Sequence, residues 1–215
     1  MEKGLRINHL AATDSWRMFH IMAEFVEGFE ALSGIGPAVS IFGSGRVGPD
    51  SPVYRKAGEI ARLLVRDGFS VITGGGLGVM EAANKGAAEE GGTSVGLRIE
   101  LSKEEVYNNY SNLTLSFRYF FVRKVMFIKY AMAYIILPGG YGTMDECFES
   151  LNLIVTQKSR TFPVIFVGED YWKGLIDWIR CVPVKVGTLN RGDLEIFQII
   201  DEPTEVIKAI KKWVI

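Results

Sequence analysis

Short apolar runs alternate along the chain with stretches whose apolar residues recur at helical spacing. Five runs, rich in Val, Ile, Leu and Phe, predict buried strands at Ala38–Phe42, Ser70–Thr73, Ser94–Leu97, Tyr134–Leu137 and Pro163–Val167. Runs that are apolar at nearly every position suit strands whose two faces are both covered. This pattern predicts a parallel sheet between two layers of helices.

Amphipathic stretches between and after these runs predict the helices. The stretch at Pro52–Arg66 has the clearest start, with Ser51 as the capping residue and Pro52 at the first helical position. The other predicted helices are Met80–Glu90, Tyr119–Tyr130, Thr143–Thr156, Tyr171–Ile179 and Glu202–Trp213. The alternation predicts a Rossmann-like α/β fold, a doubly wound parallel sheet in a three-layer α/β/α sandwich.

The segment before the first strand carries a separate helical pattern. We expect a helical extension over about residues 13–33, packed on the sheet or on a partner subunit. No internal repeat or linker marks a second domain, so residues 1–215 are expected to form a single domain. The apolar residues that carry the helical spacing are Trp16, Phe19, Met22, Phe25, Val26 and Phe29.

Composition and charge narrow the classes of partner. The 24 basic and 25 acidic side chains leave a net charge of −1, which argues against a nucleic-acid partner, because such binding needs clustered Lys and Arg. The N-terminus has no apolar signal segment, and the longest apolar stretches are too short to span a bilayer. The sequence therefore predicts a cytoplasmic protein with no membrane partner.

The positions of the Cys and His residues give little support to a metal site or to a common hydrolase triad. Cys147 and Cys181 lie outside any metal-ligand spacing, so neither a zinc site nor a disulfide scaffold is expected. His9 and His20 both lie in the N-terminal segment, which disfavours Ser-His-Asp and Cys-His hydrolases. We expect no metal and no cofactor, and Cys147 is expected to be a buried helix residue.

Glycine clusters follow three of the predicted strands, at Gly43–Gly48, Gly74–Gly78 and Gly139–Gly142. Each cluster alone is equally typical of a tight strand-to-helix turn. Three clusters at the carboxyl ends of one sheet indicate a groove in which backbone N–H groups at helix N-termini bind an anion.

The first cluster, Gly43-Ser-Gly-Arg-Val-Gly48, has the G-x-G-x-x-G spacing of dinucleotide-binding turns. However, its helix begins only near Pro52, and no Asp or Glu follows Thr73 to bind a ribose hydroxyl. The chain also lacks a Walker A Gly-Lys-Ser/Thr. A dinucleotide is therefore disfavoured, and Arg46 beside Ser44 is either a phosphate clamp or a surface residue of a mobile loop.

The third cluster lies in the most informative segment, Leu137-Pro-Gly-Gly-Tyr-Gly-Thr-Met-Asp-Glu146. The N–H groups of Gly140, Gly142 and Thr143, with the Thr143 hydroxyl, predict a monophosphate site. Glu146 is open to two interpretations. It is either a carboxylate of this site or the second half of a capping box that begins at Thr143.

The segment Pro138–Glu146 resembles the PGGxGTxxE signature of the Lonely Guy (LOG) family, the cytokinin riboside 5′-monophosphate phosphoribohydrolases, which are often labelled lysine decarboxylases. Phe121–Tyr130 resembles the Arg-Lys helix of that family, and Ile72–Gly86 resembles its second glycine turn. Ser40–Arg46 resembles a first turn that usually reads Gly-Ser-Ala-Arg. The resemblance extends from about Val39 to Trp178.

This resemblance implies an enzyme that hydrolyses the N-glycosidic bond of a nucleoside 5′-monophosphate, AMP or an N6-modified AMP such as a cytokinin ribotide. The products are a free base and ribose 5-phosphate. Arg123 and Glu146 are the implied catalytic pair; Arg123 stays protonated and acts electrostatically, while Glu146 stabilises an oxocarbenium-like ribose and orients or deprotonates water. The implied substrate-binding residues are Ser44, Arg46, Gly75, Gly76, Glu100, Lys124, Gly139, Gly140, Gly142 and Thr143.

Two other functions stay open. A non-catalytic mononucleotide carrier or sensor would bind through the same loops and release no base. A pyridoxal-phosphate decarboxylase needs a Schiff-base lysine, for which Lys124 or Lys129 would be the candidate, but the sequence shows no recognisable cofactor pocket.

The resemblance also implies a homodimer, because members of the family usually form one. The expected interface combines the apolar face of Asp14–Leu32 with a stripe on the helix that carries Arg123. The aromatic run Phe117–Phe121 is expected in the core or in this interface rather than under a base. The residues of the stripe are Val122, Val125, Met126 and Lys129.

Overall fold

The computed structural model describes residues 2–100, 106–159 and 161–214. Its strands form one sheet of seven, all parallel, in the order β4-β3-β2-β1-β5-β6-β7. The strands are β1 (Ala38–Phe42), β2 (Ser70–Thr73), β3 (Ser94–Ile99), β4 (Leu113–Phe117), β5 (Ala131–Ile136), β6 (Val164–Phe166) and β7 (Phe197–Ile199).

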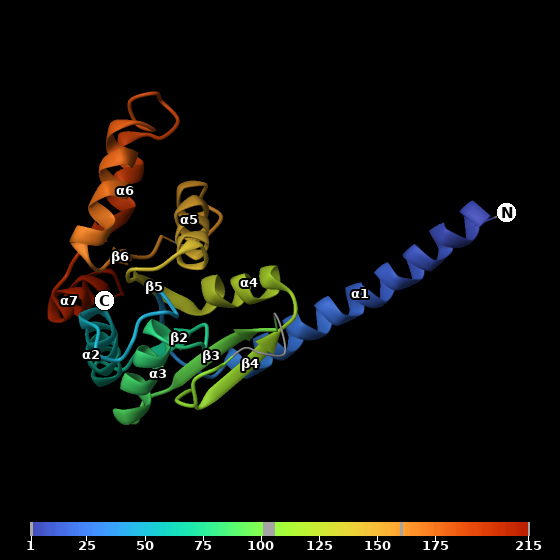
Figure 1. The fold of residues 1–215 in the computed structure, drawn as a ribbon, viewed down its shortest axis with the longest axis horizontal. Helices are drawn as coiled ribbons and strands as arrows, with labels where there is room; N and C mark the ends of the chain where they lie inside the picture. The colour runs from blue at the N-terminus through green and yellow to red at the C-terminus, as the bar shows by residue number, and fades with distance from the viewer. Residues whose placement is uncertain (1, 101–105, 160, 215) are drawn as a thin grey trace.

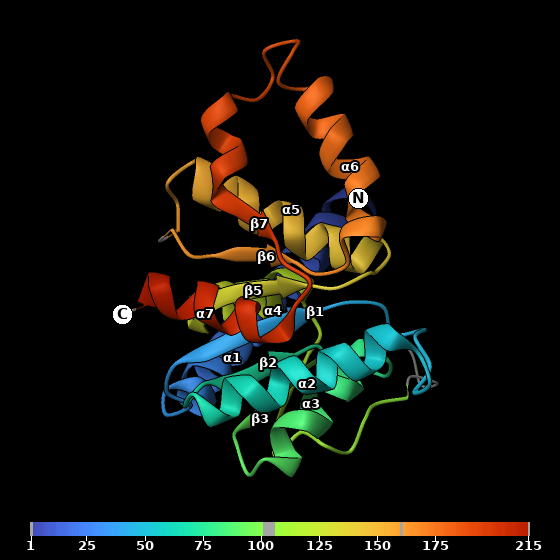
Figure 2. The same cartoon turned by 90° about the vertical axis from the view of Figure 1, so that its left-hand side faces the viewer.

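Helices cover both faces of this sheet (Figure 2). One core lies between the sheet and α1 (Glu2–Leu32), α4 (Phe120–Tyr130), α5 (Tyr141–Val155) and α6 (Glu169–Cys181). The other core lies between the sheet and α2 (Pro52–Arg66), α3 (Val79–Glu89) and α7 (Pro203–Val214). The predicted Rossmann-like α/β sandwich is therefore confirmed.

The sequence pattern found the central strands and missed the two at the edges. β1 and β2 have the predicted bounds, and the other three predicted strands differ only at their ends. The edge strand β4 was not predicted because only Leu115 and Phe117 of its five residues are buried, so it shows no continuous apolar run. β7 spans three residues, too few to show a recognisable pattern of apolar positions.

The order of the strands reverses at β1, which pairs with β2 on one side and with β5 on the other. In an open parallel sheet, such a switch point leaves a crevice outside the carboxyl ends of the two strands. Here the loops after β1 and β5 are joined, since the backbone N–H of Ser44 donates to the carbonyl oxygen of Pro138 at 3.0 Å.

The helix α1 begins at Glu2, earlier than the predicted start near residue 13, and ends at Leu32. Its N-terminal end projects away from the sheet (Figure 1). Its C-terminal part packs on α4, where Gly28 lies against Met126. Because Met126 and Val122 are completely buried in this core, the predicted interface stripe on α4 was wrong for these two residues, whereas Val125 is exposed.

Among the described helices, including the 31-residue α1, none combines the length and the apolar character that crossing a bilayer requires.

The close contact between α2 and α3 depends on two glycines. A methyl group on Gly86 of α3 would overlap the backbone carbonyl of Gly58 on α2. We expect Gly86→Ala to lower the free energy of unfolding by about 2 kcal/mol, as overpacking does. Gly174→Ala, whose methyl group would meet no atom within 4 Å on α6, is the control and should stabilise slightly. Urea unfolding measures both, and equal stability of the two variants would contradict the tight contact.

Candidate functional site

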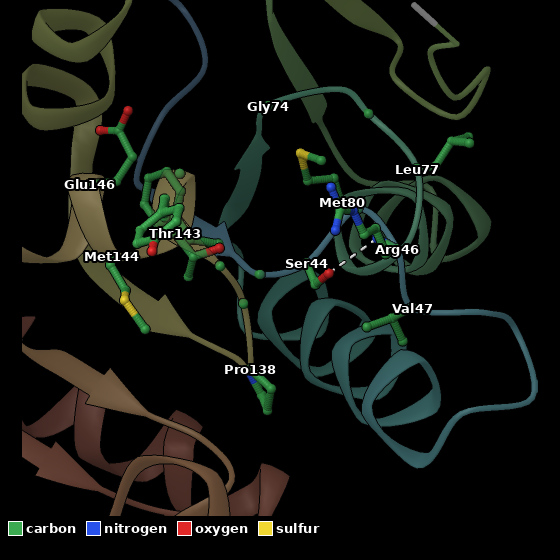
Figure 3. Close-up of a pocket in the computed structure, with 18 of the residues that line it drawn as sticks. Ser44, Arg46, Val47, Gly74, Leu77, Met80, Pro138, Thr143, Met144 and Glu146 are labelled. Carbon is green, nitrogen blue, oxygen red and sulfur yellow. Dashed lines mark hydrogen bonds between the residues drawn. The ribbon is translucent and has the colours of Figure 1, made fainter. Parts of the chain in front are cut away.

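A cavity of about 1330 Å³ opens at the carboxyl ends of the strands, around the switch point (Figure 3). The loops after β1, β2 and β5 form its floor. Arg123 and Phe127 of α4, the first turns of α5, and Tyr171 of α6 line one part of it. Ile99, Val106 and Tyr107 line another. The three predicted glycine turns therefore converge on one site.

The loop between β5 and α5 presents backbone donors to the cavity. Gly140 is the N-cap residue of α5, and the first turn of a helix leaves its N–H groups without intrahelical acceptors. A side chain on Gly140 or Gly142 would meet no atom within 4 Å, so both positions border open space. Gly139 is the opposite case, because a Cβ there would overlap the Thr143 Oγ1 and lie 3.0 Å from the Ser44 nitrogen. A helix start with open space in front of its N–H groups is a geometry that suits an anion.

The structure decides between the two interpretations of Glu146. The helix begins at Tyr141, so Thr143 is the third helical residue, and no side chain caps the helix start. The capping-box interpretation is therefore wrong. Glu146 lies one turn further along α5 and lines the cavity, next to Thr143 (Figure 3).

Arg123 and Glu146 lie side by side in a buried position. The Arg123 Nη2 is 3.9 Å from the Glu146 Oε1, and the two side chains are 14% and 5% exposed. The Glu146 Oε2 is buried and accepts no hydrogen bond from any described residue. Arg123 also lies over the Phe127 ring, with its guanidinium carbon 5.5 Å from the ring centroid.

Burial is the main reason why the pKa of Glu146 is unusually high. It raises the pKa of this carboxyl from 4.5 to about 7. The charges of Lys124 and Arg123 lower the pKa, and those of Glu149 and Asp145 raise it, so the cations offset only part of the desolvation. A carboxyl group with such a pKa exchanges its proton near neutral pH, which suits acid–base chemistry.

The loop after β1 brings Ser44 and Arg46 to the same cavity. The Ser44 Oγ accepts a hydrogen bond from the backbone N–H of Arg46 at 3.1 Å (Figure 3), and its carbonyl accepts one from Val79 at 3.1 Å. The Arg46 side chain is exposed, so its guanidinium can approach a ligand without disturbing the core.

Two glycines of the turn after β2 differ in their surroundings. Gly76 lines the cavity, whereas Gly75 does not; it has a φ of +71°, and its carbonyl accepts from the Asn108 backbone N–H at 3.0 Å. Beneath this turn, the Asn84 Oδ1 accepts from the Thr73 hydroxyl at 2.5 Å and from the Asn108 Nδ2 at 3.0 Å. Sequence analysis missed Asn84, although a polar residue on the apolar side of a helix was the available signal.

Besides Gly75, two predicted substrate-binding residues lie away from the cavity lining. The Glu100 side chain is 55% exposed and pairs with Arg118, with 3.3 Å between Oε2 and Nε. The Lys124 Nζ lies 2.9 Å from the Asp145 Oδ2 and 3.0 Å from the Glu149 Oε2. Substrate contact by Glu100 and Lys124 stays a prediction that the cavity geometry does not support.

Aromatic residues that sequence analysis missed support the site from two sides. The Tyr171 hydroxyl, on α6, donates to the Gly139 carbonyl at 2.8 Å and so holds the loop before α5. The Tyr107 hydroxyl donates to the Ile99 carbonyl at 2.7 Å, and the Arg98 guanidinium lies over the Tyr107 ring. No spacing links these tyrosines to the glycine turns, because the sheet topology alone brings them together.

Other chemistries find no support among the described residues. Cys147 is buried as predicted, and burial raises the pKa of its thiol to about 12, so it stays protonated. None of the described lysines lines the cavity, and the described His, Cys, Asp and Glu residues form no cluster that could hold a metal.

Comparison with known families identifies the chain's relatives. A family model described as "Possible lysine decarboxylase" matches residues 80–210. The chain belongs to this family. The match covers α4 and α5, which carry Arg123 and Glu146, and it confirms the LOG resemblance, since LOG proteins are often given this label. An uncharacterized relative from Archaeoglobus fulgidus is 30% identical over 130 residues, which are 60% of this chain and 83% of that protein.

Solved structures confirm the fold across most of the chain. The molybdenum cofactor binding protein from the phototrophic bacterium Rippkaea orientalis is similar with a TM-score of 0.62 at 17% identity, over 83% of this chain and 98% of that one. DNA processing protein A from Helicobacter pylori, whose single-stranded DNA binding mode is described, is similar with a TM-score of 0.54 at 18% identity, over 85% and 83% of the two chains. The fold family thus includes proteins with different ligands.

The raised pKa of Glu146 predicts a pH-dependent change in stability. A folded-state pKa of about 7 against 4.5 means that the native state holds its proton more tightly, so wild-type stability falls as the pH rises from 4.5 through 7. Glu146→Gln removes this titration and should be more stable than wild type at pH 8, by on the order of 3 kcal/mol, but not at pH 4.5. Denaturant unfolding at both pH values measures the difference.

The matched control is Glu205→Gln, which changes an exposed glutamate on α7. It should show no such pH-dependent gain. If Glu146→Gln is less stable than wild type at pH 8, the neighbouring cations offset the burial of the carboxylate more fully than the raised pKa indicates.

Proposed function

We propose that this chain hydrolyses the N-glycosidic bond of a nucleoside 5′-monophosphate to a free base and ribose 5-phosphate. The observation that carries the proposal is the buried pair of Arg123 and Glu146, one helical turn from the anion-accepting loop. Membership of the family and the position at the switch point support it.

The 5′-phosphate is proposed to bind at the start of α5. The N–H groups of Gly142 and Thr143 lie in its first turn, where the helix dipole favours an anion. Gly139 and Gly140 allow the close approach, and Ser44 and Arg46 lie on the same cavity. The rise from Thr143 to Glu146 is about 4.5 Å along the helix, so an anchored phosphate leaves the ribose beside the carboxyl group.

The proposed reaction breaks the bond between C1′ and the base nitrogen, and the bonding electrons leave with the base. A water oxygen forms the new bond to C1′, and its proton passes to the Glu146 carboxylate; the departing base takes up a proton from solvent, and Glu146 returns its own to solvent. Arg123 stays protonated and favours the ionised form of Glu146. Binding energy from the phosphate holds C1′ and the water in place.

The base is proposed to lie against the apolar part of the cavity. Leu77, Met80, Ile99 and Val106 line it together with Tyr107. These side chains offer contact area rather than hydrogen bonds, which suits a purine and an apolar substituent on it. AMP and N6-modified AMP are therefore the substrates to test first.

A non-catalytic carrier is the alternative that the fold favours. The similar protein from Rippkaea orientalis binds the molybdenum cofactor, and a cavity of about 1330 Å³ exceeds the usual volume of a small-molecule site. A carrier would bind a nucleotide or a larger cofactor and release no base. The buried acid with its counterion favours the enzyme, because a carrier has no need of it.

Substitution of the catalytic pair tests the proposal. We expect Glu146→Gln and Arg123→Ala to lower the release of free base about a hundred- to a thousandfold, because the first removes the proton acceptor and the second removes the charge that keeps it ionised. Chromatography of bases released from a panel of nucleoside monophosphates measures this. Lys208→Met, on the exposed face of α7, is the control and should match wild type. A fully active Glu146→Gln variant would refute the assignment.

A homodimer is proposed through the exposed face of α1. Phe19, Met22, Val26 and Phe29 follow one another at intervals of three, four and three residues, and all four side chains are exposed. This is the spacing of a seam between two helices. Phe121 and Val125 of α4 are exposed as well, so the apolar surface is larger than a single helix offers.

Light scattering tests this interface. Wild type should run at twice the mass of one chain, and Val26→Glu should run as a monomer, because a charge in such a seam would be buried without a partner. Trp178→Glu, which changes an exposed aromatic residue on α6, should leave the dimer intact. A monomeric wild type would remove the dimer from the proposal.

A further inference from the structure

Lys124 connects two helices at the point where the proposed acid lies. Its Nζ is 2.9 Å from the Asp145 Oδ2 and 3.0 Å from the Glu149 Oε2, and its side chain is 16% exposed. Asp145 and Glu149 are four residues apart on α5 and therefore lie on one side of that helix. Glu146 follows Asp145 directly, so the lysine spans the turn to which Glu146 belongs.

The preceding residue of α4 makes the second connection. Arg123 reaches the Glu146 Oε1 at 3.9 Å, while Lys124 reaches the carboxylates on both sides of it. Two neighbouring residues of α4 thus contact α5 at separate positions. Two contacts fix both the spacing of the helices and their relative rotation, which a single ion pair would leave free.

The charges around Glu146 are nearly balanced. α5 contributes three carboxyl groups, of Asp145, Glu146 and Glu149, and α4 contributes two cations. From β5, the buried Tyr134 faces the same group; burial and the nearby carboxylates raise the pKa of its phenol, so it stays neutral. Burial lowers the pKa of Lys124, but its bonds to Asp145 and Glu149 outweigh this, and the net pKa is raised. The lysine is therefore charged at every pH at which the site would work.

We propose that Lys124 is a positioning residue, which orients Glu146 through its ion pairs with Asp145 and Glu149 and favours the ionised form of Glu146 by its own charge rather than by touching the substrate. This rests on the proposed function of Glu146, and it replaces the substrate contact that the LOG resemblance implies for Lys124. Three observations carry it: Lys124 does not line the cavity, it is largely buried, and its ammonium group is held by two carboxylates.

The proposal predicts opposite effects for substitutions of Lys124 and of its partner Glu149. Lys124→Met removes a positive charge beside Glu146, so the carboxyl should ionise at higher pH. Glu149→Gln removes a negative charge beside Glu146, so the carboxyl should ionise at lower pH. A general loss of structure would move both variants in the same direction. Lys124→Arg keeps the charge and should restore the wild-type midpoint.

Two readouts on the purified protein test these expectations. The first is the pH dependence of kcat and KM for AMP hydrolysis. The second is a carbon-13 NMR titration of the Glu146 carboxyl carbon, assigned with Glu146→Gln, which needs no activity. We expect Lys124→Met to raise the midpoint by about one pH unit and to lower kcat near pH 7 about fivefold, with KM within about twofold of wild type. Lys208→Met, which loses only an exposed pair with Glu205, should change nothing.

The outcomes separate this proposal from the proposed function. A rise of KM in Lys124→Met with an unchanged midpoint would show that Lys124 contacts the substrate and would overturn the positioning role. An NMR midpoint that does not move, in a folded Lys124→Met or in Glu149→Gln, would overturn it as well. If wild type releases no base from any nucleotide, the proposed hydrolysis fails, and the NMR titration still decides whether Lys124 controls the ionisation of Glu146.

Discussion

The contact between the loops after β1 and β5 joins the two loops that line the cavity at the switch point. The reversal of strand order places β1 against β5, and the hydrogen bond from the Ser44 nitrogen to the Pro138 oxygen, 3.0 Å long, ties the two loops together. At position 139 only glycine fits, because a Cβ there would overlap the Thr143 side chain and crowd the Ser44 nitrogen. This contact lies just before the start of α5, and the start of α5 in turn fixes the distance from the proposed phosphate donors to Glu146.

The same geometry forces a conflict between stability and chemistry. In the proposed reaction the acid lies on the second turn of α5, which is covered by α4 and the sheet, so Glu146 is buried. Burial disfavours its charged form, and Arg123 and Lys124 compensate only in part. A carboxyl whose pKa is about 7 is a poor contributor to stability at neutral pH but an effective proton acceptor there.

The sequence was informative wherever one residue type meets one physical requirement. Continuous apolar runs occur where both faces of a strand are covered, so the five central strands could be predicted, and glycine clusters marked the turns that line the cavity. The edge strand β4, with one face open, lacks that signal. The capping box at Thr143 was a reasonable prediction from local spacing, but the helix starts two residues earlier, at Tyr141, shortly after the Pro138 carbonyl that accepts from the Ser44 N–H. Neither the ion pairs of Lys124 with α5 nor the hydrogen bonds of Asn84 could be predicted, because each set joins segments that only the folded sheet brings together.

Glycine turns at a switch point are not sufficient to distinguish an enzyme from a carrier. Backbone N–H groups bind a phosphate group in either case, and the similar folds from Rippkaea orientalis and Helicobacter pylori are described with quite different ligands. What hydrolysis needs in addition is an acid whose ionisation is set by its surroundings, and here the two cations beside it come from a second helix. The packing of α4 on α5, rather than the loops proposed to hold the phosphate, is therefore the part of this fold on which the proposed chemistry depends.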